Sequence, residues 1–522
     1  MIKYIKPDKL FLMAVFIAAC ILNLQLLDNS NINFALAGHD EYLTIREVYS
    51  ILNPLSLKHF FMAIISGDVL YYGRVMFYTD ALFAWLPYKL FGITGLVYSI
   101  RMLHTLMIIA GLAILGKTFL IDWKHRLMFF VATLTLYYSS YFFMVPKPEP
   151  IQLLILSLFF YYFKKSNFQF GRHFILLGIA YGIKFNVISL LPILFMLPFF
   201  FQADFKNLTK KLFSSLFFFV VGLLIAVPCL ILAPIKPIFF RSYYESTFAN
   251  TAHTDDDVSV GIVDWLSRGW FGAYNGGIIF GVILVIFIVI ILYVGLNKLL
   301  KNRIISSDFL MVLCGLGLTL PIVFFTKRLW PQYLWTGYIF LMLGILIFIQ
   351  SESKNKNFKA IYNSAFLLLL AGSIYCSFSQ EMNIVSLEAK TNTLNENGKK
   401  AYNYLQIKNK AFISIQDMSV PYPFKNMVEV KRYHPFASEM PMLNSPEQKF
   451  VWSNYISPQI ITDHKADYII INKLNFADTV INSNTDNTKT IIKNNQLMNK
   501  IIGKTVVLDT TFGSIKVYKI IK

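Results

Sequence analysis

Carboxylates and cations stand at a few short points of a chain that is otherwise apolar. Asp40 and Glu41 lie in GHDEYLTIREVY, directly after the first long apolar run, and Arg74 lies in YYGRVMFY. Glu149 follows in PKPEP and Lys184 in GIAYGIK. A carboxylate can act as a general base on an acceptor hydroxyl or amine, and Arg and Lys can hold a phosphate leaving group. These residue types therefore suit group transfer from a phosphate, provided that the fold brings them together.

The elements that must position these residues are membrane helices. Of the 522 residues, 56% are hydrophobic and only 15% are charged, whereas a soluble domain carries roughly a quarter charged residues. Runs such as 10–27 and 277–296 meet the requirement of about 20 apolar residues for a membrane helix. We predict an all-α polytopic membrane protein. Its eleven expected spans lie near residues 10–27, 94–117, 127–145, 151–163, 174–186, 187–201, 212–233, 277–296, 308–325, 332–350 and 360–377.

Basic residues between the spans predict the orientation of the chain. With the amino terminus in the cytoplasm, every inner segment carries three basic residues, such as Lys164, Lys165 and Arg172, which is the positive-inside pattern. The net charge of +19 therefore indicates loops held at the inner face and no nucleic-acid partner. The loops 28–93 and 234–276 then face outward, and the four motifs described above reach the same leaflet. We expect a multi-pass protein of a bacterial inner or plasma membrane.

Two further segments on the outer side have a pattern of their own. Residues 76–92 predict an amphipathic helix in the outer interface, because counting them as a span would put the basic clusters outside. From about residue 380 the chain becomes polar, and the patches 467–473 and 513–520 alternate as strands do, whereas 394–406 is typical of a helix. We predict a transmembrane domain over 1–379 and a small extracytoplasmic α/β domain over 380–522.

Several classes of site lack support in the sequence. There is no P-loop, no GxGxxG before a helix and no HExxH, so nucleotide and zinc-protease functions are not indicated. We expect His39, His253 and Asp255 to Asp257 to lie in solvated loops and not to bind a metal. All four cysteines lie inside apolar runs, so we expect no disulfide framework and no thiolate metal site; they are Cys20, Cys229, Cys314 and Cys376.

The order of the motifs resembles that of GT-C-type glycosyltransferases, especially the protein O-mannosyltransferase and lipid A aminoarabinose transferase relatives. These have an Asp-Glu pair after the first span, a basic residue before an interface helix and a second acidic residue after the third span. They also have a Gly-rich fifth span that ends in Lys, and a basic pair between spans nine and ten. The matching residues, over about residues 1–350, are Asp40-Glu41, Arg74, Glu149, Lys184 and Lys327-Arg328.

The resemblance implies a polyprenyl-phosphate sugar as donor and an acceptor, which is a glycan, a lipid or a protein, at the outer face. It implies that Asp40 is the general base, with Glu41 and Glu149 also in the catalytic site. The donor phosphate would be bound by Arg74, Lys147, Lys184, Lys327 and Arg328. The chain has Glu at the second acidic position, where Asp is commoner, and Arg at position 74, where Lys is commoner. No metal ligand is predicted, and the resemblance leaves a divalent metal open, because some relatives need one and others do not.

Each residue also has a structural alternative. Asp40 could cap a helix, Glu149 could mark a loop between prolines, and Lys184 could extend to the lipid headgroups. Lys327 and Arg328 could anchor the chain to headgroups, and Arg101 could bind phosphate or form a structural pair.

The function has alternatives as well. The first is a transporter or lipid flippase, although transporters place charge near the bilayer midplane, often in paired halves, and the sequence shows neither feature. The second is a non-catalytic assembly or sensor protein whose tail is a binding module.

Overall fold

The computed structural model describes most of the chain in two compact units. The first unit comprises residues 1–25, 64–252 and 260–381, and the second comprises 26–63, 253–259 and 382–522. The prediction drew the boundary near residue 380 and kept the whole loop 28–93 with the transmembrane domain. The described residues are 6–25, 39–54, 57–65, 72–136, 139–196, 205–235, 237, 240, 243–244, 261–273, 278–325, 331–351, 356–407, 412–415, 427–429, 450–453, 467–472, 500–513 and 515–521.

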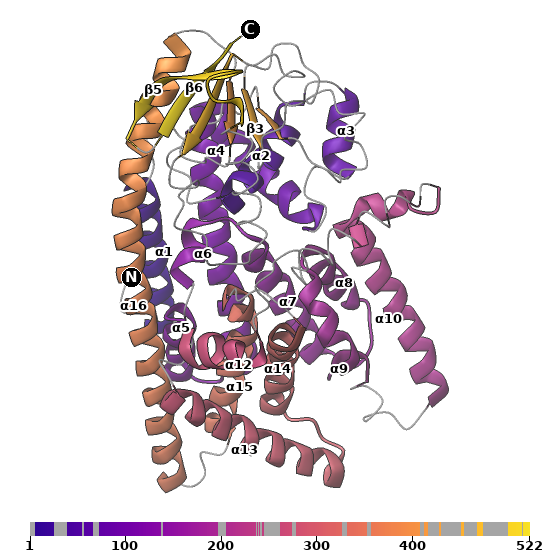
Figure 1. Ribbon diagram of the computed structural model, residues 1–522. Helices are drawn as coiled ribbons and strands as arrows, with labels where there is room; N and C mark the ends of the chain where they lie inside the picture. The colour runs from indigo at the N-terminus through magenta and orange to yellow at the C-terminus, as the bar shows by residue number, and fades with distance from the viewer. Residues whose placement is uncertain are drawn as a thin grey trace. The chain divides into compact units, whose positions relative to one another are not determined.

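The first unit is helical (Figure 1). Its longer helices are α1 (Pro7–Gln25), α4 (Arg74–Phe119), α5 (Trp123–Leu134), α7 (Pro148–Lys165), α8 (Phe174–Ile183), α10 (Phe205–Ala226), α13 (Ile278–Asn302), α14 (Ser307–Phe325), α15 (Trp335–Ser351) and the first part of α16 (Lys356–Ile407). Shorter pieces are α6 (Ser139–Met144), η3 (Phe185–Ser189), α9 (Leu190–Met196), η5 (Pro228–Leu232), α12 (Ile262–Asp264), η6 (Trp265–Ala273) and η7 (Pro331–Leu334).

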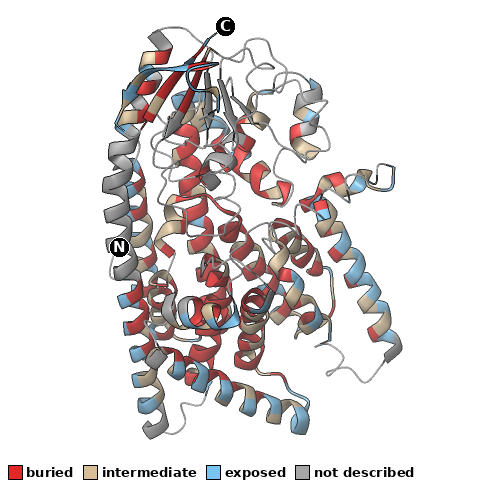
Figure 2. Ribbon diagram, viewed as in Figure 1, coloured by how far each residue is buried: buried red, intermediate tan, exposed pale blue. Residues whose placement is uncertain are grey.

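Several of these helices have the length and composition of membrane spans. Within the described ranges, six helical segments are long and apolar enough to cross a membrane, and they lie in α1, α4, α10, α13, α14 and η7–α15. Shorter apolar helices occur at Phe174–Ile183, Phe185–Met196 and Ala360–Cys376. Figure 2 shows exposed positions along α10 and α13, and large apolar side chains such as Phe217 and Tyr293 occupy them. The predicted number of eleven spans stays a prediction.

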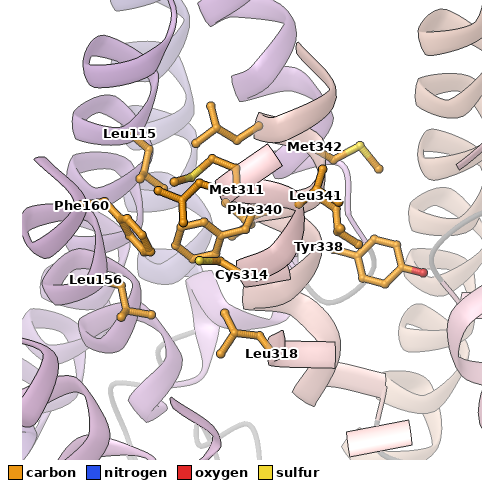
Figure 3. Packing of buried hydrophobic residues seen from close by; sticks show 14 of the residues in the cluster. Leu115, Leu156, Phe160, Met311, Cys314, Leu318, Tyr338, Phe340, Leu341 and Met342 are labelled. Atoms are coloured by element: carbon orange, nitrogen blue, oxygen red, sulfur yellow. The ribbon is translucent and has the colours of Figure 1, made fainter. Parts of the chain in front are cut away.

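The core of the first unit is built around α15. Every residue from Trp335 to Ile349 is buried, as expected for a helix that is apolar on all sides. Figure 3 shows Met311 and Cys314 of α14 and Leu341 of α15 among the packed side chains. Gly315 and Gly337 let the two helices approach closely, because a Cβ on Gly315 would lie 2.9 Å from the Gly337 carbonyl oxygen. The region that carries the site is thus fixed to a dense helical core.

The segment predicted as an interface helix is one limb of a helical hairpin. α4 changes direction at Gly92, whose φ of 62° lies in the left-handed region that glycine adopts without strain. Asp80 and His104 stand equally far from Gly92 along the chain, and their side chains meet at 3.0 Å. The limb 74–91 therefore packs on 93–119, with Asp80 buried and Leu82 83% exposed. It has the two faces expected of an amphipathic helix, and its place at a membrane interface stays a prediction.

The predicted third span, 127–145, is divided into α5 and α6. Side-chain hydroxyls donate to backbone carbonyls at the point of division, which offers the backbone an alternative to a continuous helix. Thr135 Oγ1 donates to the Val131 carbonyl at 2.8 Å, and Ser139 Oγ donates to the Thr133 carbonyl at 2.7 Å. The carbonyls at the end of α5 are thereby satisfied without a continuous helix.

The second unit contains α2 (His39–Leu52), most of α3 (Leu57–Ile65), the end of α16 and a sheet. The strand order is β2-β3-β1-β4-β6-β5. The strands are β1 (Phe412–Ile415), β2 (Met427–Glu429), β3 (Phe450–Ser453), β4 (Tyr468–Asn472), β5 (Val506–Phe512) and β6 (Ile515–Ile520). The first four pair in parallel, and β6 runs antiparallel to both β4 and β5. β4 and β6 coincide with the predicted strand patches. That this unit is an extracytoplasmic domain stays a prediction.

Candidate active site

Glu149 and Lys184 form a buried ion pair between two helix ends. Glu149 lies in the first turn of α7, where Pro148 starts the helix, and an acidic residue is favourable at a helix N-terminus. Lys184 follows the last residue of α8 in an extended conformation, with φ −152° and ψ 126°. Its Nζ donates to Glu149 Oε1, and the two side chains are 13% and 3% exposed. The two predicted residues are therefore in direct contact.

Glycines set the position of α8 and hence of Lys184. Gly178 and Gly182 form a GxxxG pair in α8, a pattern that permits close helix packing in membranes. A Cβ on Gly178 would lie 2.0 Å from the Phe219 carbonyl oxygen of α10, and a Cβ on Gly222 of α10 would lie 2.0 Å from the Ile175 carbonyl oxygen. α8 and α10 therefore lie side by side with their backbones in contact (Figure 1). The close packing of α8 on α10 is the structural reason for the glycines in GIAYGIK.

Arg74 is held against the same end of α8. The backbone N–H of Gly73 donates to the Ile183 carbonyl at 3.3 Å, and a Cβ on Gly73 would lie 2.7 Å from the Gly182 carbonyl oxygen. The Arg74 side chain is buried, and its guanidinium carbon lies 4.7 Å from the centre of the Phe77 ring. Gly73, the residue before Arg74, is thus hydrogen-bonded to Ile183, the residue before Lys184.

Aromatic rings accompany the lysines of this cluster. Lys184 Nζ lies 4.3 Å from the centre of the Tyr333 ring, and Lys147 Nζ lies 5.4 Å from the centre of the Tyr141 ring. Such cation–π contacts hold an ammonium group where little water reaches it. Tyr333 was not predicted, because an aromatic residue in an apolar chain has no signal that separates it from core packing.

Known structures provide the remaining comparison. The sequence matches no protein-family model, and no curated protein sequence matches it. The crystal structure of ArnT from Cupriavidus metallidurans bound to undecaprenyl phosphate aligns at a TM-score of 0.57 and 11% identity, over 98% of this chain and 97% of ArnT. The apo structure of the same protein aligns over equal shares at 0.55 and 10%. This chain has the GT-C fold of ArnT.

The GT-C fold confirms the predicted resemblance and the polytopic membrane architecture. A third structure, arabinofuranosyltransferase AftD from Mycobacteria, aligns with 97% of this chain and 40% of its own length at a TM-score of 0.42 and 12% identity.

The predicted acidic pair of this GT-C chain belongs to the other compact unit. Asp40 and Glu41 lie near the start of α2, and Glu41 is fully buried. That Asp40 faces the Glu149–Lys184 pair stays a prediction. Lys327 and Arg328 lie outside the described residues, as do His253 and Asp255 to Asp257. Among the described residues, no three His, Cys, Asp or Glu side chains gather closely enough to hold a metal ion.

A second buried polar pair lies within α4. His104 Nε2 lies 3.0 Å and 3.2 Å from the two carboxylate oxygens of Asp80, and both side chains are almost fully buried. Arg101 is buried one turn before His104. The pair joins the two limbs of the hairpin, and buried polar groups of this kind are favourable when they are paired. It holds in place the limb that begins with Arg74.

Proposed function

We propose that this protein is a membrane glycosyltransferase that moves a sugar from a polyprenyl-phosphate donor to an acceptor at the outer face. The main support for this proposal is the buried Glu149–Lys184 pair beside the Arg74 segment. The chain that contains it shares its fold with ArnT over almost its whole length. ArnT has been crystallised with undecaprenyl phosphate. A lipid-linked phosphate is therefore the donor class that the cations of this chain suit best.

In the proposed reaction, an acceptor oxygen or nitrogen attacks the anomeric carbon of the sugar. The bond between that carbon and the phosphate oxygen breaks, and the electron pair stays on the polyprenyl phosphate. Asp40 takes the proton of the acceptor as general base. Arg74 and Lys184 stabilise the negative charge that develops on the phosphate, which is the term that usually contributes most to catalysis.

Glu149 acts through Lys184 in this proposal. A buried ammonium group without an anion is unfavourable, and Glu149 supplies that anion before the donor binds. The pair is close to neutral as a unit, so Arg74 provides the positive charge that attracts the phosphate. Lys147, the N-terminal neighbour of α7, and the pair Lys327-Arg328 would add further cations. Glu41 would support Asp40 on the acceptor side.

The opposite ends of the same helices support the proposed orientation. Lys164, near the end of α7, donates from Nζ to the Thr118 carbonyl at 2.7 Å, at the end of α4. The basic residues assigned to the cytoplasm therefore lie one helix length away from Glu149. This supports an amino terminus in the cytoplasm and a donor site at the outer leaflet.

The substitution Asp40→Asn tests the assignment. It keeps the shape of the side chain and removes the base, so transfer in proteoliposomes that contain a lipid-linked sugar donor should fall to background while the protein stays folded and inserted. Asp264→Asn is the control, because among the described contacts the Asp264 carboxylate accepts only the local backbone N–H of Gly261. Near-normal transfer by Asp40→Asn would contradict the role of Asp40.

A further inference from the structure

Gln152 is a buried amide one helical turn after Glu149 on α7. It is fully buried inside the apolar run that follows PKPEP. Its Nε2 lies 3.1 Å from the Lys184 carbonyl oxygen, 2.9 Å from Asn186 Oδ1 and 3.3 Å from the Ala180 carbonyl oxygen. The three partners lie on both sides of the break between α8 and η3: Ala180 in the last turn of α8, Lys184 between the helices and Asn186 in η3.

The direction of this amide follows from its surroundings. The two backbone carbonyls can only accept hydrogen bonds, so the NH₂ group and not the amide oxygen must face them. The Ala180 carbonyl also accepts the backbone N–H of Lys184 at 3.2 Å. The Lys184 carbonyl accepts the backbone N–H of Val187 in η3 at a long 3.5 Å. Gln152 therefore provides the shorter of its two hydrogen bonds, at a break in a membrane helix where backbone groups need donors from elsewhere.

α7 holds Lys184 at two points, one turn apart. Glu149 binds the ammonium group of the side chain, and Gln152 binds the carbonyl of the backbone. A third contact with this segment is the hydrogen bond from the Gly73 N–H to the carbonyl of Ile183, the residue before Lys184. The extended conformation of Lys184 thus depends on groups from two other helices. Without Gln152, the Lys184 carbonyl would keep only the longer hydrogen bond from the Val187 N–H, which favours a shift of the break toward another hydrogen-bond pattern.

We propose that Gln152 is a positioning residue that fixes the backbone of Lys184 so that its ammonium group meets the donor phosphate. This inference rests on the proposed function for the nature of the ligand. Displacements of about 1 Å at a positioned group are enough to lower activity strongly. Gln152 touches no reacting atom, and its effect on phosphate binding passes through Lys184 alone.

The test measures binding of undecaprenyl phosphate to the purified full-length protein in detergent. Gln152→Met keeps the length and approximate volume of the side chain and removes the donor. We expect roughly tenfold weaker binding, as for the loss of one buried hydrogen bond. In a Lys184→Met background, Gln152→Met should cause no further loss, because coupled residues are not additive.

Ser157→Ala is the matched control on α7. Ser157 is buried like Gln152, but within the described ranges its hydroxyl bonds only the Leu153 carbonyl of its own helix, so binding should be unchanged. If Gln152→Met does not fold, Gln152→Leu takes its place, because it is apolar and has no donor for the two carbonyls; the same loss and the same dependence on Lys184 are expected.

The outcomes separate the inference from the proposed function. Wild-type affinity in the Gln152 variant overturns the positioning role, and so does an equal further loss in the Lys184→Met background, which indicates a structural role alone. Absence of undecaprenyl phosphate binding by the wild-type protein instead overturns the proposed donor class, and the inference falls with it.

Discussion

Lys164 and Lys184 lie at the two ends of neighbouring helices and have different partners. Lys164 Nζ donates to a backbone carbonyl, that of Thr118, and lies 4.7 Å from the centre of the Phe119 ring. Lys184 Nζ pairs with the Glu149 carboxylate and lies 4.3 Å from the centre of the Tyr333 ring. Both lysines are partly buried next to an aromatic ring, so burial and ring contacts do not distinguish them.

The difference lies in what each ammonium group does for the fold. Lys164 satisfies a carbonyl at a helix end, a favourable place for a cation, and this contact needs no ligand. Lys184 stands at a broken helix, and three separate contacts from Glu149, Gln152 and Gly73 fix it there. A cation that requires so much support is better explained by binding than by stability. The comparison therefore supports the proposal that the donor site lies at the Lys184 end of the bundle.

The largest effect is expected for Lys184→Met. Loss of the ammonium group removes stabilisation of the leaving phosphate, and we expect transfer to fall about 100-fold to 1,000-fold. The measurement is the initial rate in proteoliposomes with a saturating lipid-linked donor. A rate within a few-fold of wild type would remove the distinction between the two lysines.

For Glu149→Gln we expect smaller effects, which are opposite in sign for donor affinity and for transfer. The amide can still accept a hydrogen bond from Lys184, but the negative charge next to the phosphate is lost, so affinity for undecaprenyl phosphate should rise a few-fold. Transfer should fall roughly tenfold, because the ammonium group is held less firmly. Parallel measurements of affinity and turnover check this. A joint loss of both would mean that the ion pair must stay intact for binding.

The smallest effect is expected for Lys164→Met. One hydrogen bond at the inner helix ends is lost, so the unfolding free energy should fall by about 1 kcal/mol, with transfer unchanged. Thermal unfolding in detergent and the transfer assay check the two parts. A drop in transfer comparable to that of Lys184→Met would show that the two ends are not functionally distinct.

The sequence predicted the fold class and placed Glu149 and Lys184 on the same side of the membrane for the same reason. Apolar runs and loop charges predict which helix ends share a leaflet, but the ion pair between the two residues was not predicted. The Gly-rich run before Lys184 was noted as a motif, and its cause is the close packing of α8 on α10.

Other features depend on contacts that a linear pattern does not contain. The break at Gly92 agrees with the predicted boundary between the helix 76–92 and the span 94–117, but the packing of the two limbs of α4 on each other was not predicted. The Asp80–His104 pair was missed with it, since the two residues become neighbours only after the chain reverses. Gln152 did give a signal, an amide inside an apolar run, but its role depends on which carbonyls lie next to it at a broken helix.

The central claim is that the outer end of the bundle binds a polyprenyl phosphate. The most direct measurement compares the dissociation constants of undecaprenyl phosphate for the wild-type protein, Lys184→Met and Lys164→Met, purified in the same detergent. We predict at least roughly tenfold weaker binding for Lys184→Met and wild-type affinity for Lys164→Met. Equal affinity of all three proteins would contradict the claim.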